Sequence, residues 1–258
     1  MSGNDSGQEL ATADVQSLVS AGARHLYSPE NWSRLFDSEL GTYWRWHQSR
    51  IRRYVGSLLR EVPARPILSV GSHGELFGQD ANNIVHLNIE SHWVDGLANA
   101  AVGDAHRLPF PDDTFEAVLL LDSVINYCDM NSVLSECVRV AKDGAVIVLD
   151  FDNLSSLEYI RSPQRWQGKA LLPGDLPGVP HSMWYYSYEY AREAFTLRGI
   201  DVTRVHGSHF LSCLLQDRHR SLAHAAMRLD TFVPPWRRLS AHAGNVVVCG
   251  RLRSANRP

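Results

Sequence analysis

A glycine turn flanked by polar side chains is the first candidate for chemistry in this chain. In ILSVGSHGELFG, residues 67–78, an apolar run leads into Gly71, Ser72, His73 and Gly74. Glycine lets a backbone approach a ligand closely, and a following helix N-terminus offers free N–H groups to a polar or negative ligand. The spacing differs from the Gly-x-Gly-x-x-Gly pattern of dinucleotide-binding turns. An ordinary strand and turn therefore fits this segment as well as a ligand site does.

The elements around this turn predict an open, doubly wound α/β sheet. Apolar runs suited to buried parallel strands span residues 67–70, 84–89, 116–121 and 145–150. Helical or loop segments separate these runs, which is the rhythm of alternating strands and helices. In such sheets ligands bind beyond the carboxyl ends of the strands, near the point where the strand order reverses. The turn at Gly71 stands at such a strand end.

Helical spacing of apolar residues precedes the first strand, most clearly over residues 42–61. That segment also carries Arg45, Arg50, Arg52, Arg53 and Arg60. The favoured interpretation is a solvated basic face, because no alternation of aromatic and basic residues and no overall basicity point to nucleic acid. We expect residues 1–62 to form an N-terminal helical cap and residues 63–258 to form the sheet domain.

Further elements are predicted in the second half of the chain. A helix is expected over 132–144, with Ser132 as its cap and Gly144 as its end, and a terminal strand over 245–252. A stretch rich in proline and glycine, at about 153–187, predicts a loop excursion from the sheet domain. Long loops of this kind in compact domains are often functional lids.

The segment GDAHRLPFPDDTFEAVLLLDSVINY, residues 103–127, strongly resembles the class I S-adenosylmethionine-dependent methyltransferases that act on small molecules. The features that carry the resemblance are Asp104-Ala105, Leu108-Pro109-Phe110, Asp112-Asp113 and Phe115, followed by Glu136, Arg139, Val140 and Gly144 in an E-x-x-R-V-x-x-x-G pattern. The resemblance covers about residues 65–152. It implies a Rossmann-like, mostly parallel seven-stranded sheet with helices on both faces and an N-terminal helical cover. It also implies methyl transfer to a small molecule in biosynthesis, such as secondary metabolism.

The resemblance assigns S-adenosylmethionine contacts to a set of strand-end residues. They are Gly71, Ser72, His73, Gly74, Asn88, Ile89, Asp104, Ala105 and Leu121. Asp104 would accept a hydrogen bond from the adenine amino group, although an aspartate here could instead cap a turn. The family usually has an acidic residue where Asn88 stands, so a ribose hydroxyl would lack a charge-assisted bond there. Glu90 could reach the ribose instead, or be a solvated loop residue.

Methyl transfer needs an acceptor held in line with the methyl group and shielded from water. A general base helps when the acceptor is a phenol, another hydroxyl or an ammonium. The candidates are Asp122, His181 and His209, with His206 beside the last. Each histidine could equally be a structural or surface residue.

Two alternatives to this enzyme remain open. The altered turn, with His73 and Glu75 where the family has more glycine, also fits a catalytically silent protein that binds a ligand or partner. A nicotinamide-dependent enzyme is disfavoured, because the Gly-x-Gly-x-x-Gly turn is absent and the segment at 103–110 would have no role in it.

Composition restricts the partners and the compartment. The net charge of −3 gives no reason to expect a nucleic acid partner, and no apolar run approaches 18 residues, so we expect no membrane partner. The four cysteines form no C-x-x-C pair, so no metal site is expected. The N-terminus lacks the features of a signal peptide, which favours the cytoplasm. A homodimer stays open.

Overall fold

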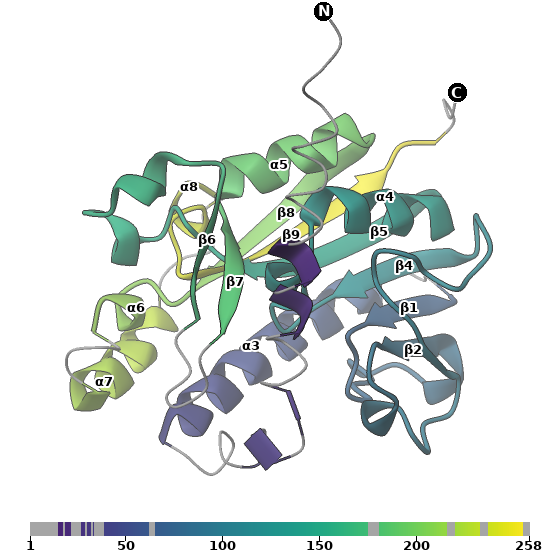
Figure 1. Cartoon of the computed structure of the whole chain (residues 1–258), viewed down its shortest axis with the longest axis horizontal. Coiled ribbons are helices and arrows are strands. Elements are labelled where there is room, and N and C mark those ends of the chain that lie inside the picture. The colour runs from purple at the N-terminus through teal and green to yellow at the C-terminus, as the bar shows by residue number, and fades with distance from the viewer. Residues whose placement is uncertain are drawn as a thin grey trace, which may run out of the picture.

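The computed structural model describes residues 15–17, 19–21, 27–28, 30–31, 33, 39–61, 65–174, 181–215, 220–232 and 237–254. Seven strands form one sheet in the order β3-β2-β1-β4-β5-β9-β8 (Figure 1). The strands are β1 Ile67–Val70, β2 Ile84–Asn88, β3 Ala100–Val102, β4 Phe115–Leu120, β5 Ala141–Asp152, β8 Ile200–Ser208 and β9 Asn245–Leu252. β1 to β5 pair in parallel, and β9 runs antiparallel to both β5 and β8. This arrangement confirms the predicted mostly parallel, seven-stranded sheet.

Helices cover both faces of the sheet. The longer helices are α3 Glu39–Glu61, α4 Met130–Val140, α5 Tyr188–Leu197 and α7 Arg220–Asp230, and the short ones are α6 Ser212–Leu215 and α8 Arg237–Ser240. Short 3₁₀ helices span Ala81–Asn83, Ser91–Trp93, Val124–Tyr127, Leu157–Tyr159 and Pro163–Trp166. On one face, Ile51, Val55 and Leu58 of α3 pack against inward-facing strand residues. Buried residues of α4 and α5 pack on the other face, because successive strand side chains point to opposite sides.

The helix expected over 132–144 is shorter and starts earlier than predicted. Its cap is Asp129, not Ser132: the Asp129 carboxylate accepts the Ser132 backbone N–H at 3.0 Å, and the Ser132 hydroxyl donates to the same carboxylate at 2.8 Å. The helix ends at Val140, and β5 begins at Ala141. Gly144 lies inside that strand with a φ of +75°. The sequence pattern was misleading because an aspartate and a serine three residues apart are both good caps.

The predicted excursion at 153–187 contains a two-stranded antiparallel hairpin, β6 Lys169–Pro173 and β7 Ser182–Tyr186. Its Ala170, Met183 and Tyr185 side chains join a small apolar cluster with Val19 and Tyr127. The excursion is therefore packed onto the body of the protein through the described residues on both sides of 175–180. No helix among the described residues is long and apolar enough to cross a membrane.

Candidate active site

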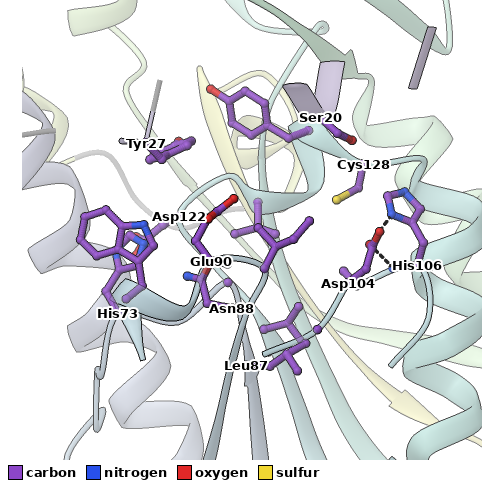
Figure 2. Close-up of a pocket in the computed structure, with 18 of the residues that line it drawn as sticks. Ser20, Tyr27, His73, Leu87, Asn88, Glu90, Asp104, His106, Asp122 and Cys128 are labelled. Atoms are coloured by element: carbon purple, nitrogen blue, oxygen red, sulfur yellow. Dashed lines mark hydrogen bonds and ion pairs between the residues drawn. The ribbon is translucent and has the colours of Figure 1, made fainter. Parts of the chain in front are cut away.

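A pocket of about 870 Å³, including open solvent at its mouth, lies at the carboxyl ends of β1, β2, β3 and β4 (Figure 2). Its lining comes from five parts of the chain that are distant in sequence. They are Ser20, Tyr27 and Trp44; Val70, Gly71 and His73; Leu87, Asn88, Ile89, Glu90 and Trp93; Gly103, Asp104, Ala105 and His106; and Asp122, Val124, Tyr127 and Cys128. The position is the one that an open α/β sheet offers to ligands.

Gly71 makes the turn after β1. Its φ is +71°, in the left-handed region that glycine tolerates best, and a Cβ atom there would lie 2.2 Å from Val124 Cγ2. The next residue, Ser72, is buried: its N–H donates to the Leu87 carbonyl at 3.0 Å, and its Oγ lies 2.8 Å from His86 Nδ1. The turn is thus tied to β2 and has space for glycine alone.

Asn88, at the end of β2, uses both ends of its side chain on the backbone. Its Nδ2 donates to the Ser72 carbonyl at 2.9 Å, and its Oδ1 accepts the Glu90 N–H at 3.1 Å. The amide therefore holds the two loops together, which leaves it poorly placed to bind a ribose as well. Glu90 also lines the pocket and is the better candidate for that contact.

Asp104, beyond β3, is held by a neighbouring histidine. Its Oδ1 accepts the His106 N–H at 2.9 Å and lies 2.7 Å from His106 Nδ1, as the dashed lines in Figure 2 mark. The Asp129 N–H donates to His106 Nε2 at 3.1 Å. Since Nε2 is the acceptor, we assign the ring proton to Nδ1, which then donates to Asp104. The carboxylate is fixed in direction while its side chain stays 53% exposed, so it can still accept from a ligand.

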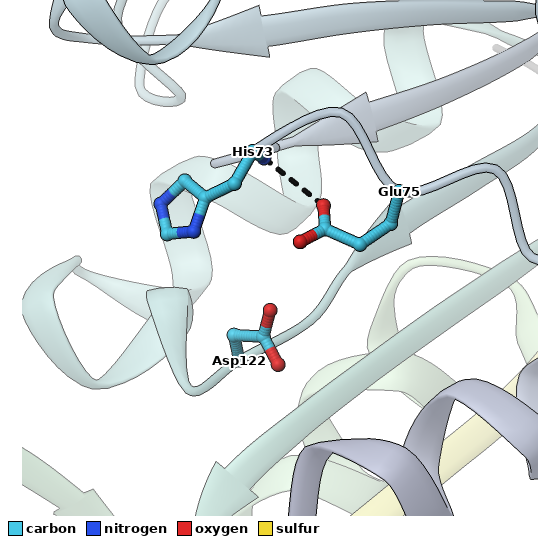
Figure 3. A group of neighbouring side chains, drawn as sticks. All are labelled: His73, Glu75 and Asp122. Atoms are coloured by element: carbon cyan, nitrogen blue, oxygen red, sulfur yellow. Dashed lines mark hydrogen bonds between the residues drawn. The ribbon is translucent and has the colours of Figure 1, made fainter. Parts of the chain in front are cut away.

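His73, Glu75 and Asp122 form a cluster beside the turn (Figure 3), and Arg52 of α3 pairs with two of them. Arg52 Nη2 lies 2.7 Å from Glu75 Oε1 and 3.9 Å from Asp122 Oδ2. Glu75 Oε2 accepts the His73 N–H at 3.0 Å, and the His73 ring stacks on Trp93 with 4.4 Å between centroids. Thus Glu75 folds back onto the turn and pairs with α3.

One donor beside this cluster is buried without a hydrogen-bond partner among the described residues, Arg52 Nε of α3. Gln48, one turn earlier on α3, lowers the pKa of Asp122 through a side-chain hydrogen bond. A buried donor left unpaired is costly, so Arg52 Nε is a natural contact for a ligand oxygen that reaches this cluster. The ligand atoms of His73, Glu75 and Asp122 lie within 4.8 Å of one another and could in principle hold a metal ion. The Arg52 guanidinium already supplies positive charge there, so a divalent ion would meet repulsion and we assign no metal.

Asp122 has an unusual backbone and an unusual pKa. Its φ is +62° and that of Ser123 is +58°, a strained pair of non-glycine residues of the kind that clusters at functional sites. Burial, and next the negative charge of Glu75, raise the pKa of Asp122 to about 7, against the lowering effect of Arg52. Behind it, the buried Asp150 accepts the Ser123 N–H at 3.2 Å. Asp122 can therefore change its protonation state near neutral pH.

This pKa predicts a pH dependence of stability. A carboxyl whose pKa is raised on folding binds more protons in the folded state, so its contribution is present at low pH and is lost as pH rises through about 7. We expect the free energy of unfolding of wild type, relative to Asp122→Asn, to fall by at most about 4 kcal/mol between pH 4 and pH 8. Urea unfolding of both proteins across that range measures the difference. A constant difference would contradict the raised pKa.

The pocket gathers some of the residues predicted from the sequence and not others. Those that line it are Gly71, His73, Asn88, Ile89, Asp104, Ala105 and Asp122. Ser72 and Gly74 support the turn from behind, and Leu121 is buried in the core under α3. His181 and His209 are buried outside the pocket lining. His209 Nε2 lies 2.7 Å from His47 Nδ1, and burial holds its pKa well below the usual value.

Several residues of the site were missed by the sequence analysis. Tyr27 and Trp93 line the pocket, and Arg52 contacts the lining residue Asp122 from outside. The sequence pattern predicts Arg52 only as one of five arginines on a solvated basic face. Its spacing from Gln48 on the same helix face was the available signal, because residues four apart on a helix lie side by side.

Comparison with known proteins identifies the class to which this site belongs. Residues 70–149 match the family described as "Methyltransferase domain". Demethylmenaquinone methyltransferase of Geobacillus kaustophilus is 29% identical over 130 residues, which cover 48% of this chain and 56% of that protein. 2-Phytyl-1,4-naphtoquinone methyltransferase of Synechococcus elongatus is 40% identical over 81 residues, covering 30% and 34%. The aligned segments thus span between a third and about half of the length of these relatives.

Solved structures share the whole architecture. A SAM-dependent methyltransferase from Thermotoga maritima superposes with a TM-score of 0.51 at 17% identity, covering 85% of this chain and 99% of that one. A Pyrococcus horikoshii protein gives a TM-score of 0.53 at 14% identity, covering 84% and 93%. At these sequence identities the structural similarity shows a shared fold and nothing about activity. The chain therefore has the fold of these solved structures, and its residues 70–149 match the methyltransferase domain family.

Proposed function

We propose that this protein transfers a methyl group from S-adenosylmethionine to a small-molecule acceptor. The observation that carries the proposal is the pocket at the ends of β1, β2 and β3, formed by Gly71, Glu90 and Asp104 within the matched methyltransferase domain. The relatives reported above are named as methyltransferases, and none of them supports the alternative of a silent binding protein.

The residues of the pocket fit the three parts of the cofactor. Asp104 is placed to accept from an adenine amino group, and Glu90 to accept from ribose hydroxyls with charge assistance. The unpaired donor Arg52 Nε suits the carboxylate of the methionine tail, and Glu75 suits its ammonium. S-adenosylmethionine supplies an already activated methyl group, so the chain has to bind, orient and exclude water.

The acceptor side of the pocket favours a planar, largely apolar molecule. Tyr27, Trp44, Trp93 and Tyr127 provide aromatic surface on which a ring could pack. We infer that Asp122, with its pKa of about 7, takes the proton from an acceptor hydroxyl. The naphthoquinone and menaquinone in the names of the relatives support a planar ring system as the acceptor.

The test is methyl transfer itself. Incubation with methyl-labelled S-adenosylmethionine and a panel of naphthohydroquinones and simple phenols should give labelled product, detected after extraction. Asp122→Asn should lower turnover by about 100-fold or more, since a general base contributes about that much, while cofactor affinity is kept. No transfer to any hydroxylated aromatic would contradict the acceptor class, and retained turnover in the variant would contradict the role of Asp122.

Asp104 has a prediction of its own. Asp104→Ala should weaken binding of S-adenosylhomocysteine by about 1–3 kcal/mol, as expected for an acceptor lost from a polar partner. It should leave binding of the inosine analogue, which lacks the adenine amino group, nearly unchanged. Calorimetric titration of both proteins with both ligands checks this. An equal loss of affinity for the two ligands would show that Asp104 does not bind the amino group.

We also propose, on the net charge of −3, that the protein has no nucleic acid partner, and, on its four buried free thiols, that it acts in the reducing cytoplasm. We further propose that residues 1–62 form a cap on the acceptor side of the sheet. The positions of Ser20, Tyr27 and Trp44 in the pocket lining support this proposal.

A further inference from the structure

The helix α7 carries apolar side chains on two faces, and only one of them is buried. Ala226 and Met227 face the protein interior at 4% and 6% exposure. Leu222, Leu229 and Phe232 are 55%, 57% and 82% exposed. With the exposed Ala225 between the first two, Leu222 and Leu229 lie on one stripe of α7. Phe232 lies in the turn just after the helix, where its N–H donates to the Leu229 carbonyl at 2.9 Å. We call residues 222, 225, 229 and 232 the α7 stripe.

The stripe is presented by a rigid support and continues onto α6. The buried carboxylate of Asp230 accepts three backbone N–H groups, from Phe210, Leu211 and Ser212, at 2.8–3.1 Å. These bonds fix α6 against α7. Leu211 and Leu214, at the α6 end of the pair, are 42% and 41% exposed. Figure 1 shows α6 and α7 together at one end of the molecule, beside the N-terminal part of α3.

The surroundings of this apolar surface are basic. In the sequence alone, residues 211–240 contain five arginines against two aspartates. The carboxylate of Asp230 is bonded to the backbone N–H groups just described. Arg228, on α7 itself, is exposed. The neighbouring helix α3 carries the exposed Arg45 and Arg53. This helix lies near α7, since the negative charge of Asp230 acts on the pKa of Arg50. Glu158 is an exposed acid near Cys213 of α6, so the balance remains positive.

We propose that the α6–α7 surface docks onto an anionic lipid bilayer. The α7 stripe would enter the boundary between headgroups and acyl chains, and the arginines would meet the lipid phosphates. Association of two copies through the same surface would bring the arginines of both copies together, which charge repulsion opposes. The expectation of no membrane partner rested on the lack of a spanning segment, and binding at a bilayer surface needs none.

The test is co-sedimentation of the full chain with vesicles. Wild type should pellet with vesicles of phosphatidylcholine containing about 30% phosphatidylglycerol at about 0.1 M NaCl, and much less with phosphatidylcholine alone or at about 0.5 M NaCl, because screening weakens surface attraction. The double variant Leu229→Asp, Phe232→Asp should bind at least about tenfold more weakly, since it removes most of the apolar stripe and adds negative charge.

The matched control is Leu197→Asp, because Leu197 is an exposed leucine (75%) of α5, a helix that Figure 1 shows apart from α7. It should bind vesicles as wild type does. Leu222→Ser serves as a second stripe variant with a smaller change, and urea unfolding shows that each variant is folded. Absence of wild-type binding to anionic vesicles, or equal loss in the control, would overturn the proposal. So would light scattering that finds a dimer which the stripe variants dissociate, because the surface would then serve a second copy of the chain.

Discussion

Gly71→Ala is expected to weaken binding of S-adenosylhomocysteine at least about 100-fold, which corresponds to about 2.7 kcal/mol. The added Cβ would lie 2.2 Å from Val124 Cγ2, at a φ of +71°. Relief of that contact requires the turn or the segment after β4 to move, and both line the pocket. The change therefore acts on the shape of the site, and calorimetric titration measures it.

Gly78→Ala is the matched control for this change. Gly78 has nearly the same φ, +75°, but a Cβ atom there meets nothing within 4 Å. Both variants share the cost of a left-handed alanine, about 1–2 kcal/mol of stability, and only the first has the clash. If the two variants lost affinity equally, backbone strain alone would explain the effect and the close packing of Gly71 would be irrelevant to binding.

Arg52→Met is expected to weaken binding of the amino acid half of the cofactor and not of its nucleoside half. It should weaken binding of S-adenosylhomocysteine by about 10- to 100-fold, the range for a lost hydrogen bond to a charged group. It should leave binding of 5′-methylthioadenosine, which lacks the amino acid tail, nearly unchanged. The physical reason is that the Arg52 guanidinium contacts Glu75 in the cluster that we assign to the tail, while its buried Nε has no partner. Competition titrations with the two ligands check the prediction.

Arg53→Met is the control for Arg52→Met, because Arg53 is exposed on the same helix and its Nε donates only to the Ser49 carbonyl at 3.2 Å. It should bind both ligands as wild type does. Arg52→Lys should restore part of the affinity by keeping the charge. Equal weakening of both ligands by Arg52→Met would mean that the arginine merely supports Glu75 and Asp122, and the tail would have to lie elsewhere.

The sheet and the adenine side of the site were predictable because their signals are local. Buried parallel strands read as short apolar runs, and β1, β2, β4 and β5 fall on the predicted ones. Asp104 follows a strand in a recognisable segment, so its place in the pocket followed from the sequence. Even there, the bond from His106 that directs its carboxylate was not foreseen, because it depends on the fixed position of Asp129.

The rest of the site was not predictable because it joins distant segments. Arg52 and Asp122 are brought together only by the packing of α3 against the sheet, and no local pattern encodes that contact. Asn88 was predicted to contact the ribose by analogy, while the structure shows both ends of its amide bonded to backbone. His209 was a candidate base from its type alone. Its position in a buried pair with His47 could not be read from a strand-end pattern.

The central claim is that the pocket at the ends of β1, β2 and β3 binds S-adenosylmethionine. Its most direct test is calorimetric titration of the wild-type full chain with S-adenosylhomocysteine, supported by thermal unfolding with and without the ligand. We predict saturable binding of one ligand per chain and a raised unfolding temperature, as ligand binding to the folded state requires. No heat and no change in unfolding temperature at about 1 mM ligand, where even a weak site would be occupied, would contradict the account.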